Sequence, residues 1–250
     1  MINTDKSFLT AQRLRQDLGL SENSYVDLDY VAEKLMIKVR RVNLGEGIEG
    51  ACKSEGIKRL IVLTPFSYSE EKERFTFSHE IGHLLIHHGS HYCNNDYFNT
   101  WQTQNSIEKE ANDFAAELLL PKKTLISTLK KKDLSFALVK EIAKTFRTTI
   151  SVAIIRLVSL YDDCVVAIRH DGQKIFWVAR SQHCFLKISS IVSPLALANN
   201  LDSKNTYIRE NINSQYWLDE EVSNLICEEE THYFSKLKQY LTILKFYEDD

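Results

Sequence analysis

Two histidines four residues apart place the strongest constraint on what this chain can form. His79 and His83 enclose Glu80 in the pattern HExxH. Residues i and i+4 of an α-helix lie on one face, so both imidazoles can bind one metal ion at Zn–N distances of roughly 2.0–2.1 Å. Glu80 follows the first histidine and reaches the attacking water rather than the metal. The pattern therefore predicts a catalytic zinc site with Glu80 as its base.

Histidine usage decides how much weight this pattern carries. The chain has 8 histidines among 250 residues, and HExxH would arise by chance in roughly one or two of a hundred such chains. The motif lies in an apolar stretch that is typical of a buried helix. Its apolar neighbours are Phe75, Phe77, Leu84, Leu85 and Ile86. This context favours a metal site over coincidence.

The histidines that follow do not supply the third ligand. His87 continues the four-residue spacing, but it lies about 12 Å along the axis from His79, at about 1.5 Å per residue. This distance is too long for a shared ion, so we expect His87 at the surface or in packing. The extended pattern HExxHxxGxxH is also excluded, because the chain has Ile86 and Gly89 where that pattern needs glycine and histidine.

A catalytic zinc takes three protein ligands, and the third is expected on a helix predicted for residues 106–119, which Pro121 ends. This helix carries two acidic candidates, Glu108 and Glu110. Glu108 shares a face with Asn112 at i, i+4, so Asn112 can hydrogen-bond a ligand imidazole while Glu108 binds the metal. Glu110 has no such partner and is expected to be solvated. Spacing therefore favours Glu108.

Hydrophobic periodicity predicts an α+β fold in three parts. A mostly helical zinc-metallopeptidase core with a small β-sheet is expected over residues 1–121. A helical, helix-turn-helix-like segment follows over 122–160. A smaller C-terminal α/β domain is expected over 161–250, where the pattern changes to short apolar runs.

Capping residues and apolar spacing define the individual elements. Ser67 and Glu70 form a capping box that opens the histidine-bearing helix, which is expected to end near His88. Residues 90–105 are polar and aperiodic, which predicts a loop, and the glycines of 45–56 predict turns. Further helices are predicted over 8–18, 28–35, 106–119, 124–129, 136–146 and 150–160. Strands are predicted at 37–39, 60–63, 165–168 and 175–178, and a helix or strand at 240–246.

Net charge selects no partner for the whole chain. At −3, it gives no general attraction to nucleic acid or anionic lipid. Residues 122–147 differ locally, with eight basic residues against two acidic ones. Such an excess can bind phosphates, which makes a DNA-binding regulator one alternative. A solvated helix face, or a dock for a protein substrate, is the other.

Cysteine usage and apolar run lengths indicate the compartment. The 5 cysteines are odd in number, scattered and without a CxxC pair, which is typical of reduced thiols in a cytoplasm. No apolar run approaches the roughly 18 residues of a membrane span, and the N-terminal residues lack the layout of a signal peptide. A cytoplasmic protein without membrane association is therefore expected.

Two stretches of the chain resemble a known family. They are FTFSHEIGHLLIHH at 75–88 and EKEANDFAAELLLP at 108–121. Together they are similar to the signature of the ImmA/IrrE family of bacterial and phage metallopeptidases, which is HExxH followed by ExxAN-x-FA-x-x-LL-x-P. The resemblance covers roughly residues 10–160. Residues 161–250 resemble accessory regions of some family members, one of which is GAF-like.

The resemblance implies roles for residues of both stretches. It implies that zinc is bound by His79, His83 and Glu108. Glu80 takes the catalytic role. Because a set of two histidines and one glutamate tolerates other divalent ions, Mn²⁺ or Fe²⁺ can replace Zn²⁺.

The substrate expected for the chain rests on this resemblance alone. Family members cut, or otherwise relieve, helix-turn-helix transcriptional repressors in mobile-element induction and stress responses. We therefore expect a zinc-dependent endopeptidase that cleaves one such repressor. The alternative is a non-proteolytic repressor-binding module, although the intact Glu80 argues against it. An oxyanion-stabilising residue is also expected, and its unranked candidates are His88, His91, Tyr92 and Tyr97.

Overall fold

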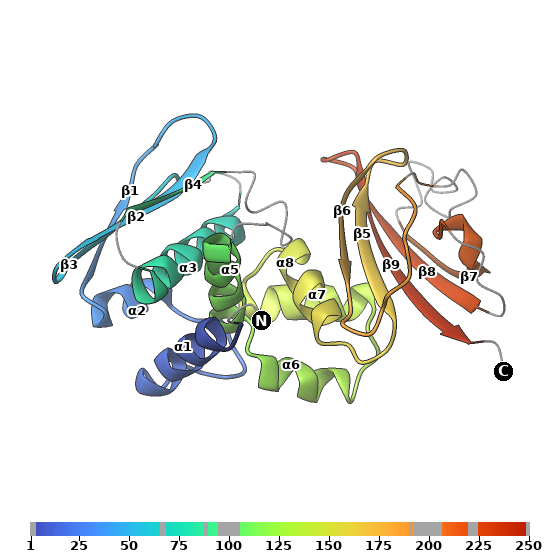
Figure 1. Ribbon diagram of the computed structural model, residues 1–250, viewed down its shortest axis with the longest axis horizontal. Helices are drawn as coiled ribbons and strands as arrows, with labels where there is room; N and C mark the ends of the chain where they lie inside the picture. The colour runs from blue at the N-terminus through green and yellow to red at the C-terminus, as the bar shows by residue number, and fades with distance from the viewer. Residues whose placement is uncertain are drawn as a thin grey trace. The chain divides into compact units, whose positions relative to one another are not determined.

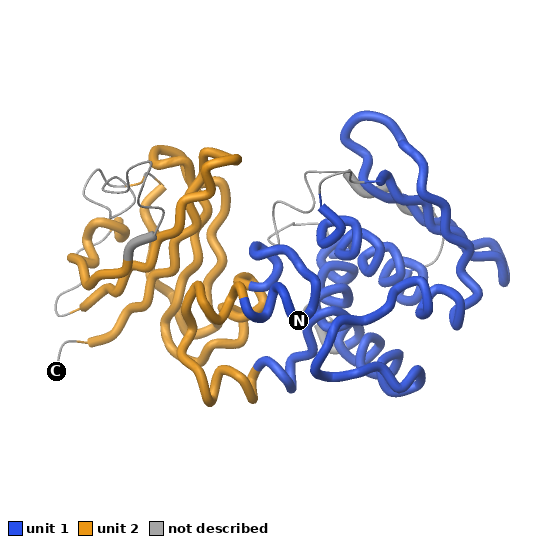
Figure 2. Tube along the Cα trace, turned by 180° about the vertical axis from the view of Figure 1, so that it is seen from behind, with its two compact units in different colours: residues 1–125, 141–153 blue, residues 126–140, 154–250 orange. Residues whose placement is uncertain are grey.

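The computed structural model describes residues 4–65, 69–87, 90–94, 106–190, 192, 207–219 and 225–248. The chain forms two compact units (Figure 2). The first unit contains residues 1–125 and 141–153, and the second contains residues 126–140 and 154–250. The division into three parts at residues 121 and 160 stays a prediction.

Seven α-helices lie within the described part of the chain. They are α1 (Thr4–Asp17), α2 (Leu28–Lys34), α3 (Glu70–Ile86), α5 (Ser106–Leu119), α6 (Lys122–Leu129), α7 (Phe136–Phe146) and α8 (Ile150–Ser159). The helices predicted over 106–119 and 136–146 have the predicted bounds. The others differ from prediction by a few residues at their ends, where capping contacts rather than periodicity decide the boundary.

The start and end of α3 illustrate this. Its N-cap is Ser69, whose Oγ accepts a hydrogen bond from the backbone N–H of Lys72 at 3.2 Å. The expected capping box began at Ser67, which lies outside the described residues. The helix ends at Ile86 rather than near His88, because His87 already has an extended backbone, with φ −113° and ψ 152°.

A four-stranded sheet packs against α3 through β2 and β3 (Figure 1). Its strands are β1 (Ile37–Arg41), β2 (Ile48–Glu55), β3 (Lys58–Leu63) and β4 (Ser90–Asn94). The order is β1-β3-β2-β4, in which β1 runs parallel to β3 and the other neighbours are antiparallel. The small sheet expected in this part of the chain is therefore present.

Two of its strands were not expected. β2 runs through the glycine-rich stretch predicted as turns, and within that stretch positive φ is confined to Gly45, Gly47 and Gly56. β4 lies in the stretch 90–105 predicted as a loop, and its backbone pairs with β2. An edge strand is held by hydrogen bonds on one side only, so it needs no apolar alternation that a sequence pattern would reveal.

The second unit contains a five-stranded antiparallel sheet. Its strands are β5 (Val165–His170), β6 (Ile175–Arg180), β7 (Tyr207–Asn213), β8 (Leu225–Phe234) and β9 (Gln239–Glu248), in the order β6-β5-β9-β8-β7. The predicted hairpin is confirmed as β5 and β6. A short 3₁₀ turn, Ser214–Tyr216, follows β7.

The α/β expectation for residues 161–250 is wrong for the described part of that range, which contains no α-helix. The segment around 240–246, left open between helix and strand, is a strand. Consecutive residues of β9 are buried from Leu241 to Leu244, so both faces of the sheet are covered. A strand that is buried on both sides loses the two-residue alternation, and its sequence then looks like a buried helix.

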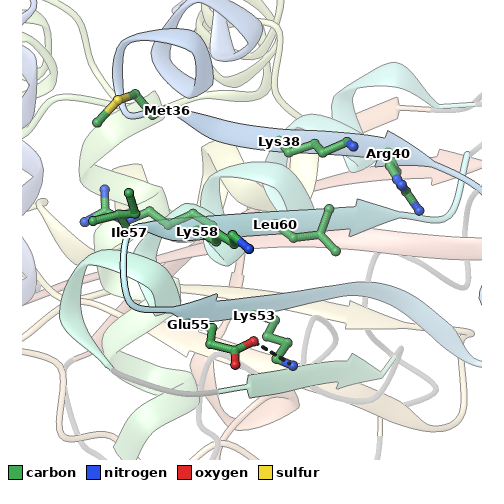
Figure 3. A pocket seen from close by; sticks show the side chains of 9 residues that line it. Met36, Lys38, Arg40, Lys53, Glu55, Ile57, Lys58 and Leu60 are labelled. Carbon is green, nitrogen blue, oxygen red and sulfur yellow. Dashed lines mark ion pairs between the residues drawn. The ribbon is translucent and has the colours of Figure 1, made fainter.

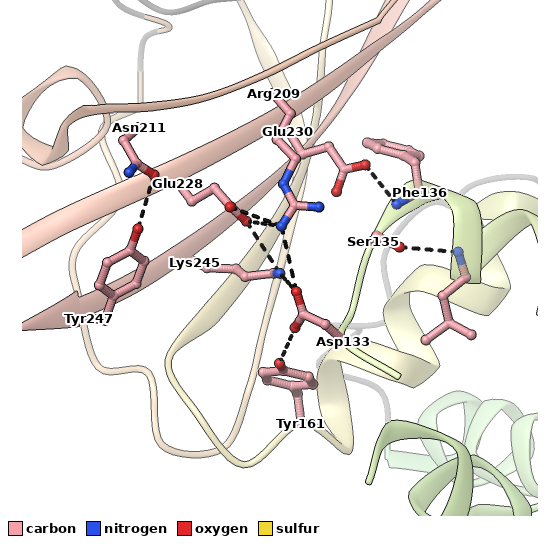
Figure 4. A network of polar contacts seen from close by, with 11 residues as sticks. Asp133, Ser135, Phe136, Tyr161, Arg209, Asn211, Glu228, Glu230, Lys245 and Tyr247 are labelled. Carbon is pink, nitrogen blue, oxygen red and sulfur yellow. Dashed lines mark hydrogen bonds and ion pairs between the residues drawn. The ribbon is translucent and has the colours of Figure 1, made fainter. Parts of the chain in front are cut away.

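Polar contacts fix one face of this sheet to the start of α7 (Figure 4). Asp133 accepts a hydrogen bond from the hydroxyl of Tyr161 at 2.7 Å and forms an ion pair with Lys245. Glu230 on β8 accepts a hydrogen bond from the backbone N–H of Phe136 at 3.0 Å. Burial alone would raise the pKa of the Asp133 carboxyl, but the contacts with Lys245 and Tyr161 hold it below its usual range.

The cysteines differ in part from expectation. Cys164 and Cys184 form a disulfide, with Cα atoms 4.3 Å apart, so the expectation of reduced thiols is wrong for this pair. Twenty residues separate the two cysteines, and no spacing motif reveals their approach. Cys52 and Cys227 are buried and form no disulfide. No helix in the described ranges is long and apolar enough to cross a membrane.

Candidate metal centre

Three buried side chains converge between α3 and α5. His79 and His83 are fully buried on α3, and their Nε2 atoms lie 2.9 Å apart. Glu108 on α5 places Oε2 at 3.1 Å from Nε2 of His79 and Oε1 at 3.5 Å from Nε2 of His83. One ligand atom from each residue lies within 4.8 Å of the others, so this group can bind a metal ion. Two imidazoles and one carboxylate are a donor set that zinc accepts.

A glycine inside the motif lets α5 approach α3 this closely. A Cβ atom at Gly82 would lie 2.9 Å from Cδ1 of Phe114 and 3.3 Å from Cα of Ala111. Contacts under about 3 Å are too short for a real Cβ, so any larger residue would push the helices apart. Gly82 therefore positions Glu108 opposite the two histidines.

The ionisation of Glu108 suits a metal ligand. Burial alone would raise the pKa of its carboxyl, but its close contacts with His79 and His83 outweigh burial and hold the pKa well below its ordinary range. The carboxylate is therefore charged at neutral pH, as a ligand must be.

Asn112 orients the first histidine from α5. Its Oδ1 lies 2.9 Å from Nδ1 of His79. An amide oxygen only accepts, so Nδ1 carries the proton, and Nε2, on the side of Glu108, is left as the nitrogen that can bind a metal ion. The structure thus places Asn112 where the i, i+4 argument expected it, one turn after Glu108.

A second chain of contacts orients the other histidine. Nδ1 of His83 lies 3.1 Å from Nδ1 of His87, and Nε2 of His87 lies 3.1 Å from Oε2 of Glu110. The Glu110 carboxylate accepts from Nε2 of His87, so Nδ1 of a neutral His87 is free to accept from His83. Burial lowers the pKa of His87, which favours that neutral form. His83 therefore also presents Nε2 to the centre.

These contacts correct two expectations. His87 was expected at the surface or in packing, and Glu110 was expected to be solvated. Both are largely buried, with side-chain exposures of 12% and 18%, and both support a histidine of the centre. His87 contacts Nδ1 of His83 and does not belong to the group that can bind a metal ion, as its distance from His79 along the helix predicts. A contact between two residues of different helices has no signature in the spacing of either helix.

Glu80 lies against the backbone of β2. It is fully buried, and a Cβ atom at Gly50 would lie 2.7 Å from Oε1 of Glu80. The adjacent Glu49 is also buried and forms an ion pair with Lys72, while burial raises the pKa of the Glu49 carboxyl. Sequence reasoning missed both strand residues. A glycine inside a strand is a recognised signal of close backbone approach, and it could have identified Gly50.

The candidates for an oxyanion-stabilising side chain stay untested. His88 and Tyr97 lie outside the described residues. His91 and Tyr92 belong to β4, of which only the backbone is described.

A helix that carries HExxH, beside a helix that adds a carboxylate, is the arrangement of a metallopeptidase domain. Residues 32–158 match the family model described as the IrrE N-terminal-like domain. The chain therefore belongs to the ImmA/IrrE family of metallopeptidases.

Among solved structures, 11 chains match this one. One of them is a transcriptional regulator of Mycobacterium tuberculosis, with a TM-score of 0.61 and 12% sequence identity. The alignment covers 96% of this chain and 76% of that chain. At this identity the likeness shows the fold alone. Among curated proteins, no match was found.

Proposed function

We propose that the protein is a zinc-dependent endopeptidase that cleaves a specific helix-turn-helix transcriptional repressor. The observation that carries the proposal is the convergence of His79, His83 and Glu108, with Glu80 fully buried one position after His79 on α3. A bound divalent ion would supply Lewis-acid polarisation of the scissile carbonyl and of the attacking water. Zinc fits the donor set, and Mn²⁺ or Fe²⁺ is compatible with it.

The chain's own residues provide the proton transfers. Glu80 follows His79 in the same turn of α3, so its carboxylate can take a proton from the attacking water and pass it to the leaving amine. Gly50 leaves the space that this carboxylate occupies against β2. Asn112 and His87 hold the two imidazoles with Nε2 toward the centre. The reaction is amide hydrolysis without a covalent enzyme intermediate.

The choice of substrate is supported by family membership. ImmA/IrrE proteins act on repressors encoded nearby, and derepression of mobile-element or stress-response genes is the expected consequence. A cytoplasmic location, where such repressors bind DNA, is part of the same proposal.

Incubation of the purified, zinc-loaded protein with the helix-turn-helix repressor encoded beside its gene tests this function. We expect cleavage at a defined bond, which a chelator prevents and zinc restores. Glu80→Gln should keep zinc and fold but lose cleavage, because only the base is removed. His83→Ala should lose the metal. Cleavage by Glu80→Gln at the wild-type rate would overturn the mechanism.

DNA binding is the alternative function. The basic residues of 122–147 are all exposed, as phosphate contacts require. However, most of α8 is buried, including Ile154 and Leu157, so it lacks the free face with which a recognition helix reads a groove. Steeply salt-dependent binding to duplex DNA, together with stable association with an uncut repressor, would favour this alternative.

A further inference from the structure

An open pocket of about 520 Å³ lies on the four-stranded sheet, formed by β1, β2 and β3 (Figure 3). We refer to it as the β1–β3 surface, which has one acidic residue among its lining residues Met36, Lys38, Arg40, Lys53, Glu55, Ile57, Lys58, Arg59 and Leu60. Alternate residues of β3 point to opposite faces, and Ile61 and Leu63 are fully buried. The β1–β3 surface is therefore the face of the sheet turned away from α3 and the metal centre.

Strand register arranges this surface as a basic–apolar–basic row. Leu60 on β3 pairs with Lys38 on β1 and with Lys53 on β2. Neighbouring strands lie about 4.8 Å apart, so the two lysines stand about 10 Å apart with Leu60 between them. An α-helix with its side chains is about 10–12 Å wide. A helix lying along β3 would therefore have one lysine on each flank.

Aliphatic side chains extend the apolar part of the row into solvent. Ile57 is 90% exposed and Met36 is 79% exposed. Met36 also has a φ of 54°, a left-handed conformation that glycine and asparagine adopt at much lower cost. A large apolar side chain at such an exposed, unfavourable position contributes little to folding stability, which points to a role in binding.

Most of the positively charged side chains of this surface are not held in strong ion pairs. Within the part of the chain that the structure describes, Lys38, Arg40 and Lys58 form no ion pair. Lys53 contacts Glu55 at 3.5 Å, and both of these side chains are exposed. Such an exposed pair is worth little and is easily exchanged for another partner.

We propose that the β1–β3 surface docks an acidic amphipathic helix of a protein partner, with aliphatic side chains on Leu60, Met36 and Ile57 and carboxylates on the flanking cations. The charge of the surface is complementary to such a helix, and the apolar centre matches its stripe. Nucleic acid fits less well, because the surface offers no aromatic ring for base stacking and its exposed aliphatic side chains would gain nothing from phosphates. Docking here does not depend on peptidase activity.

Fluorescence anisotropy with the full chain and synthetic helical peptides tests the proposal. The probe peptide has a leucine stripe flanked by glutamates; two matched peptides replace the glutamates by lysines or the leucines by serines. We expect binding of the probe alone. Lys38→Glu combined with Lys53→Glu should weaken it about tenfold. Met36→Asn should weaken it about threefold without lowering Tm, because asparagine tolerates the left-handed conformation.

The matched control is Arg13→Glu combined with Lys123→Glu, which makes the same change of charge on exposed helical positions of the same unit. It should leave binding unchanged. Equal weakening by the control, or equal binding of the lysine peptide, would overturn the proposal. The proposal would also be overturned if the Lys38 and Lys53 substitutions weakened binding of duplex DNA or of anionic vesicles but not binding of the probe peptide. Because Glu80→Gln should bind the probe like wild type, a negative result here leaves the proposed peptidase function intact.

Discussion

Nδ1 of His83 lies 3.1 Å from Nδ1 of His87, and Glu110 accepts a hydrogen bond from the far nitrogen of His87. The second histidine of the HExxH motif is thus oriented by a carboxylate from another helix, through an intervening imidazole. Outer contacts of this kind fix the tautomer and rotation of a metal-binding histidine.

Removing either outer partner of His83 should weaken metal binding without abolishing it. We expect His87→Ala and Glu110→Gln to lower zinc affinity about 10- to 100-fold, because His83 loses the contact that orients Nε2. Competition with a chelator measures this affinity directly. Asp113→Asn, a similar change to a carboxylate that pairs with Lys109 on the same helix, should leave the affinity unchanged. Unaltered affinity in both variants would show that the His87 contact has no part in metal binding.

The two acidic residues at the start of α5 should behave differently. Glu108→Ala removes a donor atom and should lower zinc stoichiometry far more than Glu110→Ala, which removes only an outer contact. Metal content after gel filtration gives the answer. If Glu110→Ala removed the zinc and Glu108→Ala did not, the assignment of Glu108 as the third ligand would be wrong.

Substitution of two glycines near the centre should affect different properties, catalysis for Gly50 and metal binding for Gly82. Gly50→Ala should displace the Glu80 carboxylate, lowering kcat about 10- to 100-fold with metal content unchanged. Gly82→Ala should instead separate α5 from α3, weaken zinc binding and destabilise the first unit by about 1–3 kcal/mol through overpacking. Each variant acts as the control for the other. Identical profiles would mean that these close contacts do not position separate functions.

Acid should destabilise the second unit through His170. Burial lowers the pKa of this histidine to about 4 from the ordinary 6.5. Below pH 6.5 this histidine therefore becomes protonated in the unfolded chain but stays neutral in the folded unit. The free energy of unfolding then falls as the pH drops toward about 4. In the His170→Asn variant this loss of unfolding free energy, about 3 kcal/mol at most, should be absent. Thermal unfolding of wild type and variant between pH 7.5 and pH 4.5 compares the slopes; parallel slopes would exclude His170 as the cause.

The centre was predictable as far as its residues are neighbours within one helix. His79, Glu80 and His83 follow from spacing on α3, and Glu108 with Asn112 follows from spacing on α5. Spacing works because an α-helix repeats every 3.6 residues, so sequence separation alone decides which side chains share a face. Family resemblance then joined the two helices, and the structure brings His79, His83 and Glu108 within ligand distance of one another.

Only the tertiary structure decided the contacts that cross between elements. Glu110 hydrogen-bonds His87, and Glu80 packs against Gly50, because separate elements approach one another in space. The same holds for the pairing of β4 with β2, for the antiparallel sheet in place of an α/β domain, and for the disulfide of Cys164. Sequence periodicity records what lies along one element. The distance between two elements depends on how their side chains pack, and no repeat within either element encodes it.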